Sequence, residues 1–185
     1  KEYDAEDVRM FMLSAQYRSP LNFSRESIAQ AHASLTRLYT ARDHLAFLLE
    51  KAPDRVPDAQ EEGFLQRVQT YRDRFDEAMD DDLNTAGAIG VLFELVYDCN
   101  TTLTEHSARA AIAGAQQALN ELSDVLGLLM KQADALPHEV QTLADQRAQA
   151  RQQKDWAASD ALRKQLHELG YQVEDTPAGQ KLSKV

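Results

Sequence analysis

The chain lacks the features that mark membrane, secreted and fibrous proteins. None of its apolar runs approaches the roughly 18 residues that a membrane span requires, and it opens with no basic-then-apolar signal peptide. Its single cysteine, Cys99, excludes an internal disulfide and fits a reducing compartment. Seven glycines and five prolines among 185 residues exclude collagen-like and low-complexity structure. We therefore expect a globular, cytoplasmic protein that does not bind membranes.

The chain also lacks an excess of positive charge. Its formal net charge is −10, and the excess acid lies in one part of the chain. Residues 1–137 hold 13 Lys and Arg against 23 Asp and Glu, whereas residues 138–185 hold seven of each. The acidic total argues against non-specific binding of nucleic acid. It leaves room for a local site in the neutral C-terminal part.

Motifs of catalysis and of metal binding are missing too. No two of the five histidines lie three or four residues apart, and one cysteine cannot complete a zinc site. The sequence contains no nucleophile elbow and no glycine-rich phosphate loop. We therefore predict no catalytic residue, no metal ligand and no cofactor in this chain. The histidines are His32, His44, His106, His138 and His167.

One acidic cluster, "DDDLNT" at residues 80–85, has two interpretations. A calcium loop would spread its oxygen ligands over about twelve residues with a Gly and a final Glu, and that pattern is absent. Capping of the helix that follows, by Asp82 or Asn84, is the simpler interpretation, since negative charge suits a helix N-terminus.

Most of the chain has the periodicity of amphipathic helices. A short helix is predicted from about Asp4, with Val8, Phe11 and Met12 facing inward. Four long helices with short connections follow, and such a pattern predicts an antiparallel four-helix bundle. Their predicted positions are 25–49 after the N-cap Ser24, from Asp58 onward, from Asp82 or Asn84 onward, and about 107–131.

Composition changes near Leu136 and Pro137, where we place a hinge. A polar helix is predicted at 139–153, then a helix from Trp156 to Leu169, then a hairpin that turns at Pro177 and Gly179. The fold class is thus mainly α, a four-helix bundle followed by a small α+β module of two helices and a β-hairpin. We divide the chain at 1–23, 24–135 and 138–185. The apolar face of the second module helix is predicted to be Ala158, Leu162, Leu166 and Leu169.

The only tryptophan, Trp156, stands among charges in "KDWAASDALR". One interpretation is that it packs in the core of a small module. The other is that it offers an aromatic surface to a nucleobase, since Asp160 and Arg163 lie one and two turns further along the same helix face. Stacking on the ring, with a carboxylate and a guanidinium for base edges, suits unstacked RNA bases.

A basic series precedes this tryptophan. Arg147, Arg151 and Lys154 fall at i, i+4 and i+7 and predict one basic stripe on a polar helix. A solvated face without a ligand is the common interpretation of such a stripe. The adjacent aromatic residue makes an RNA contact the alternative.

At these residues the sequence resembles a known family. "ARQQKDWAASDALRKQLHELGYQVEDTPAG" is similar to the C-terminal end of bacterial cysteinyl-tRNA synthetase. "YDAEDVRMFMLSAQYRSPLNFS" resembles the stem-contact segment of that family, and "MDDDLNTAGAIGVLFEL" resembles its helical bundle. The resemblance implies a class I aminoacyl-tRNA synthetase, whose catalytic domain uses ATP to attach cysteine to tRNA(Cys) and holds a zinc ion.

The resemblance implies that this chain is the tRNA-binding C-terminal half of such an enzyme. We expect it to contain no ATP or zinc site and to be inactive alone, with a monomer favoured. By position, the residues that would bind the GCA anticodon are Arg151, Trp156, Asp160 and Asp175, and Arg147, Lys154 and Arg163 are further candidates for RNA contact.

One departure and two alternatives remain. The family commonly continues "D-T-P-x-G-T-x-W", whereas Gly179 is here followed by "QKLSKV". The alternatives are a helical-bundle interaction protein with no RNA role, and a related ligase that joins cysteine to an amino sugar. The complete "KDWAASDALR" favours the synthetase over the second.

Overall fold

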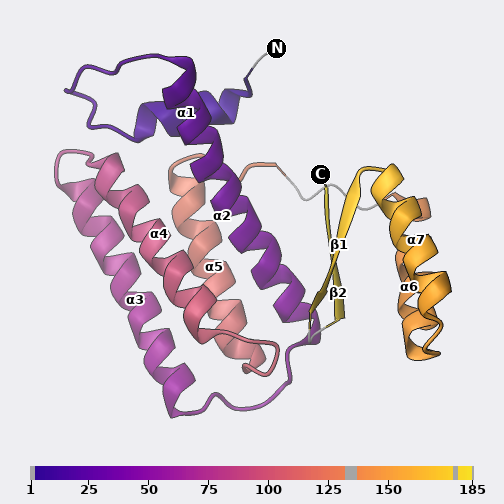
Figure 1. Cartoon of the computed structure of the whole chain (residues 1–185). Coiled ribbons are helices and arrows are strands. Elements are labelled where there is room, and N and C mark those ends of the chain that lie inside the picture. The colour runs from indigo at the N-terminus through magenta and orange to yellow at the C-terminus, as the bar shows by residue number, and fades with distance from the viewer. Residues whose placement is uncertain (1–2, 132–136, 177–178, 185) are drawn as a thin grey trace. The chain divides into compact units, whose positions relative to one another are not determined.

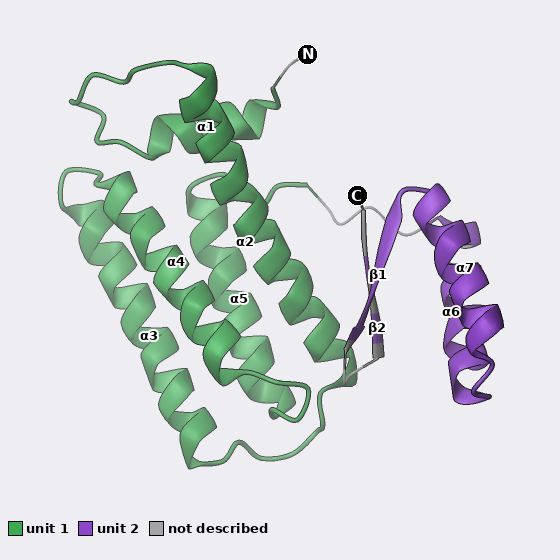
Figure 2. Ribbon diagram, in the orientation of Figure 1, with its two compact units in different colours: residues 1–132 green, residues 133–185 purple. Residues whose placement is uncertain are grey.

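The computed structural model describes residues 3–131, 137–176 and 179–184. It is mainly helical, with one two-stranded antiparallel sheet near the C-terminus (Figure 1), which confirms the predicted fold class. The chain forms two compact units, residues 1–132 (unit 1) and 133–185 (unit 2), shown in Figure 2. Of the predicted hinge at Leu136 and Pro137, Leu136 lies outside the described residues, and so does Pro177 of the predicted turn at Pro177 and Gly179.

Unit 1 is built on four long helices joined by short loops. They are α2 (Arg25–Lys51), α3 (Ala59–Asp80), α4 (Thr85–Thr102) and α5 (Arg109–Val125), and consecutive helices run in opposite directions (Figure 1). Leucine, isoleucine and phenylalanine side chains fill the space between them, which is the dominant stabilising term for such a bundle. The side chains with no exposed surface include Ile28, Leu38, Phe64, Leu92, Leu95, Ile112 and Leu119.

Local sequence sets the start of three bundle helices. The Ser24 side chain accepts a hydrogen bond from the backbone NH of Ser27 at 3.1 Å. Asp58 accepts from the NH groups of Gln60 and Glu61, each at 3.0 Å. Asn84, one of the two predicted caps of α4, accepts from the NH of Gly87 at 2.9 Å. These bonds satisfy helix donors that have no intrahelical partner.

Asp82, the other predicted cap, has a different role. Its φ of 53° places it in the left-handed turn between α3 and α4. Its carboxylate accepts a hydrogen bond from the hydroxyl of Tyr17 at 2.9 Å and lies 3.1 Å from the guanidinium of Arg18. The acid thus ties the segment after α1 to this turn.

The last bundle helix is shorter than the predicted 107–131. It ends at Val125, and the chain then turns through Gly127 at φ 64° and Leu129 at φ 60°. Left-handed residues cannot continue a right-handed helix. The NH of Leu128 donates to the carbonyl of Ser123 at 2.9 Å instead, which closes the end of α5.

The first helix, α1 (Ala5–Leu13), buries Phe11 as predicted and leaves Val8 half-buried, but it buries Met10 in place of Met12. Met12 is 59% exposed, whereas Met10 is 2% exposed. Two acidic side chains on the same side of the helix as Met10 are also buried, and each has a polar partner. Glu6 accepts from the hydroxyl of Tyr39 at 2.7 Å, and Asp7 pairs with a ring nitrogen of His32 at 2.9 Å.

Unit 2 consists of α6 (His138–Gln152), α7 (Trp156–Glu168), β1 (Tyr171–Thr176) and β2 (Gly179–Lys184). Its core contains Val140, Leu166, Tyr171 and Val173. Leu169, predicted to face inward, is 42% exposed. The helix ends one residue earlier, and Gly170 at φ 83° turns the chain into β1, so that Tyr171 and Val173 cover Leu166 instead.

Among the residues that the structure describes, none of the helices combines the length and the apolar character that a membrane crossing demands.

Candidate nucleic-acid interface

The turn between α6 and α7 positions the predicted RNA-binding residues. Lys154 adopts a left-handed φ of 60°, and its NH donates to the carbonyl of Arg151 at 3.0 Å, which ends α6. Asp155 then caps α7 as predicted, accepting from the NH of Ala158 at 3.0 Å. The tight turn brings the last turn of α6 beside the first residue of α7, Trp156.

Trp156 lies on the surface of unit 2. It is 57% exposed, so the alternative that it forms the module's core is wrong. The Cζ atom of Arg151 lies over its ring, 5.6 Å from the centroid. An exposed indole beside a guanidinium offers a flat apolar surface and hydrogen-bond donors at one place, a combination that binds unpaired bases.

A groove lies along α7, from Asp160, one turn after Trp156, to His167. Asp160 and Arg163, predicted to share a face with Trp156, are both exposed and both line it. The groove has a volume of about 850 Å³, and β1 forms its other wall. Sequence reasoning missed Lys164 and His167, although their helical spacing from Asp160 signals a shared face. The lining consists of Asp160, Ala161, Arg163, Lys164 and His167 of α7 with Tyr171, Gln172 and Val173 of β1.

Asp175 lies near the end of β1 and contacts two arginines of α6. Its two carboxylate oxygens each accept from a different Nη of Arg147, both at 2.9 Å. Nη1 of Arg151 lies 3.2 Å from Oδ2. The bond with Arg147 is the main cause that lowers the pKa of Asp175, against the opposing effect of partial burial, and the charges of Arg147, Arg151 and Arg163 add to it. Asp175 is thus held by two guanidinium groups of α6.

Arg147 does not lie on an exposed basic stripe. Its side chain is only 1% exposed, and Asp175 and Gln180 accept hydrogen bonds from its two Nη atoms. The predicted stripe is therefore wrong in this respect: Arg151, with 39% of its side chain exposed, and Lys154 reach solvent, but Arg147 offers no donor to a ligand. Arg147 lies on the α6 face that packs against the hairpin.

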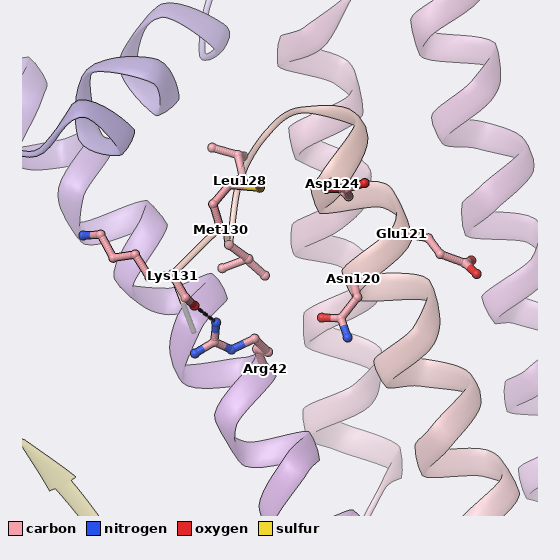
Figure 3. A pocket seen from close by; sticks show the side chains of 8 residues that line it. Arg42, Asn120, Glu121, Asp124, Leu128, Met130 and Lys131 are labelled. Carbon is pink, nitrogen blue, oxygen red and sulfur yellow. Dashed lines mark hydrogen bonds between the residues drawn. The ribbon is translucent and has the colours of Figure 1, made fainter. Parts of the chain in front are cut away.

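Unit 1 has a smaller hollow of about 460 Å³, shown in Figure 3. Arg42 of α2 and Lys131 lie on one side of it, and Asn120, Glu121 and Asp124 of α5 line the other. The guanidinium of Arg42 donates to the backbone carbonyl of Lys131 at 2.5 Å and pairs with Asp43 at 2.7 Å. Arg42 thus fastens the segment after α5 to α2, and the hollow mixes both signs of charge.

The residues between 3 and 184 that the structure describes contain no group of three His, Cys, Asp or Glu side chains arranged to hold a metal ion. The polar groups at the end of α6, along α7 and on β1 are arranged for hydrogen bonding and stacking.

Two family models match the chain. The DALR domain matches residues 74–130, which run from the end of α3 through α4 and α5. The cysteinyl-tRNA ligase anticodon binding domain matches residues 133–181, which contain α6, α7, Trp156 and Asp175. The two matches follow each other in the order that the sequence resemblance predicted, and they support a role in binding the tRNA anticodon. The chain belongs to the cysteinyl-tRNA synthetase family and carries the DALR and anticodon-binding domains of its C-terminal region.

Proposed function

We propose that unit 2 binds the GCA anticodon of tRNA(Cys), so that the catalytic domain known in this family can attach cysteine to the correct tRNA. The observation that carries the proposal is the exposure of Trp156, 57%, beside the guanidinium of Arg151. Both residues lie within the part of the chain that matches the anticodon-binding domain. Cytoplasmic protein synthesis is the setting that this role implies.

Each side chain has a distinct part in the proposed recognition. Trp156 stacks on one base, an interaction worth roughly 1–3 kcal/mol per base. Asp160 accepts hydrogen bonds from base amino groups, while Arg151 donates to base oxygens or ring nitrogens. Asp175, the fourth residue that the family resemblance implies, accepts from a further base donor.

The groove beside Asp160 extends this surface. Its volume of about 850 Å³ accommodates a nucleotide, and Arg163 and Lys164 place positive charge on its α7 wall. Phosphate contacts of this kind fix the position of the strand without reading sequence. We therefore assign base reading to the Trp156 end and backbone contact to the Arg163 end.

The charge distribution favours specific over general binding. The acidic part of the chain, residues 1–137, repels RNA that makes no specific contacts. The neutral residues 138–185 hold the proposed contacts. Affinity then depends on a few placed groups, and we expect its salt dependence to be shallow compared with that of a basic RNA-binding protein.

The test is a titration of the chain with anticodon stem-loops, followed by the emission of Trp156, the sole tryptophan. A GCA loop should quench or shift the emission at lower concentration than loops with one altered anticodon base. Equal affinity for all loops, or no response to any, would overturn the proposal. Complete absence of binding would favour a bundle that interacts with proteins.

A further inference from the structure

Arg147 is an unusual buried residue. At 1% exposure it is the largest fully buried side chain in the described part of the chain, and it lies on a polar helix. Its two Nη atoms are hydrogen-bonded, but its Nε, also buried, has no partner. Burying a charged group and leaving one donor unpaired both cost stability. An apolar side chain would fill this space without that cost.

The guanidinium connects α6 to both strands of the hairpin. Nη1 donates to Asp175 of β1 and to Oε1 of Gln180 of β2, both at 2.9 Å, and these two residues are paired across the hairpin. The side-chain amide of Gln180 in turn donates to the carbonyl of Ala144 on α6. The family that the sequence resembles commonly has Thr at the position of Gln180. The glutamine at this position thus gives the hairpin a polar contact with α6.

The same carboxylate also holds a second arginine. Oδ2 of Asp175 accepts from Nη2 of Arg147 at 2.9 Å and lies 3.2 Å from Nη1 of Arg151. Arg151 then lies over the ring of Trp156. A continuous series of contacts therefore runs from buried Arg147 through Asp175 and Arg151 to the exposed indole.

We propose that Arg147 is a positioning residue for the anticodon-binding surface: it does not contact RNA, but it fixes Asp175, which holds the Arg151 guanidinium against Trp156. The inference rests on the proposed function above. A forked guanidinium that bonds both carboxylate oxygens sets the plane of the carboxylate as well as its position. Two groups held in place before RNA arrives bind with less loss of conformational entropy.

The test compares Arg147→Lys with Gln180→Ala. Lysine keeps the charge but cannot bond both oxygens of Asp175 at once. Gln180→Ala removes the other hairpin contact of Arg147 and leaves Asp175 and Arg151 unaltered, so it is the matched control for a general loosening of the hairpin. For each variant the melting temperature is measured, with affinity for a GCA stem-loop and for a loop with one altered anticodon base.

We expect Arg147→Lys to reduce the preference for the GCA loop by about tenfold, the size of one charge-assisted hydrogen bond. Gln180→Ala should lower the melting temperature but keep the preference of the unmodified chain. The inference is overturned if Arg147→Lys keeps full preference, or if the two variants lose preference equally. The second result would mean that hairpin stability alone matters.

A measurement without RNA separates this inference from the proposed function. The fluorescence of Trp156 is quenched with acrylamide and with iodide, and the ratio of the two reports how close the Arg151 guanidinium lies to the ring. Arg147→Lys should change the ratio of iodide to acrylamide quenching, whereas Gln180→Ala should not. If the unmodified chain shows no preference among loops, the proposed function fails, and the quenching ratio still decides the role of Arg147. If Arg147→Lys fails to fold, Asp175→Glu is measured in the same way. This variant keeps the charges of Arg147 and of the carboxylate but displaces the carboxylate by one methylene. An unchanged quenching ratio in Asp175→Glu would overturn the inference.

Discussion

The guanidinium of Arg151 lies over the indole of Trp156, with its Cζ atom 5.6 Å from the ring centroid. A cation thus lies over one face of the ring, and 57% of the surface of Trp156 is exposed to solvent. A cation near an exposed aromatic ring contributes about 0.5–1 kcal/mol, enough to favour one ring orientation. Trp156 is therefore held on the surface in an orientation that leaves it accessible to a base.

Replacing Asp160 should alter which anticodon is bound more than how strongly RNA is bound in general. Asp160→Asn exchanges one acceptor oxygen for an amino donor, so a base amino group that faced the carboxylate meets a donor instead. We expect the preference for the GCA stem-loop to fall by about tenfold, within the range for a lost base-edge contact. Affinities for loops altered at each anticodon position measure it. A uniform loss for every loop would contradict base reading by Asp160.

A substitution of Lys154 tests two effects separately: that of its backbone conformation on stability and that of its side chain on RNA binding. Its φ of 60° is unfavourable for a residue with a side chain but not for glycine. Lys154→Gly should therefore stabilise unit 2 by about 0.5–1 kcal/mol in chemical unfolding. If the lysine also contacts phosphate, the same variant binds tRNA more weakly and with a shallower salt dependence. A loss of stability would show that this turn does not have the left-handed geometry.

Cys99 should react slowly in the folded protein. It is 3% exposed, and burial raises the pKa of its thiol to about 12, with the adjacent charge of Asp98 adding to the effect. The thiolate, which is the reactive form, is scarce at neutral pH and out of reach. Alkylation by iodoacetamide should be orders of magnitude slower in buffer than in denaturing urea. Similar rates in the two solutions would show that α4 is open at this point.

The ion pair of Asp98 and Arg67 should contribute to stability in a pH-dependent way. Asp98 is 9% exposed and accepts from Nε and Nη2 of Arg67 at 2.8 and 2.9 Å and from the hydroxyl of Thr102 at 2.9 Å. The bonds with Arg67 are the largest cause that lowers the pKa of Asp98, against an opposing effect of burial. Asp98→Asn should cost about 2 kcal/mol at pH 7.

The sign of the pH effect follows from the lowered pKa. The contribution of the carboxylate is fully present above the ordinary aspartate pKa of about 3.9. It is lost as the pH falls through the lower pKa of the folded state, where the carboxylate becomes protonated. The stability difference between Asp98→Asn and the unmodified chain should therefore shrink as the pH falls below about 4. Urea unfolding at several pH values measures it, and a difference that grows in acid would contradict the prediction.

Local signals in the sequence predicted the fold well, because helix caps and apolar periodicity act over a few residues. Asp58 and Asp155 cap helices as predicted. In α1 the burial of Phe11 was predicted, but the burial of Met10 was not. Met10 is buried rather than Met12 because Glu6 finds the hydroxyl of Tyr39, a partner 33 residues away.

The candidate site likewise has one feature that the sequence indicated and one that it could not indicate. The exposure of Trp156 agrees with its charged neighbours along the chain, which signal a residue outside the core. Burial of Arg147 depends on Asp175 and Gln180, 28 and 33 residues further on, and no spacing within α6 indicates it. A basic periodicity therefore could not show which arginine faces RNA and which supports the hairpin.

The central claim is that the indole of Trp156 stacks on an anticodon base. The most direct measurement is the affinity of Trp156→Ala for a GCA anticodon stem-loop, taken together with its melting temperature. We predict that affinity falls by roughly 10- to 100-fold while the melting temperature hardly changes, since 57% of the residue is exposed. Unchanged affinity, or a collapse of the melting temperature that accounts for the loss, would contradict the claim.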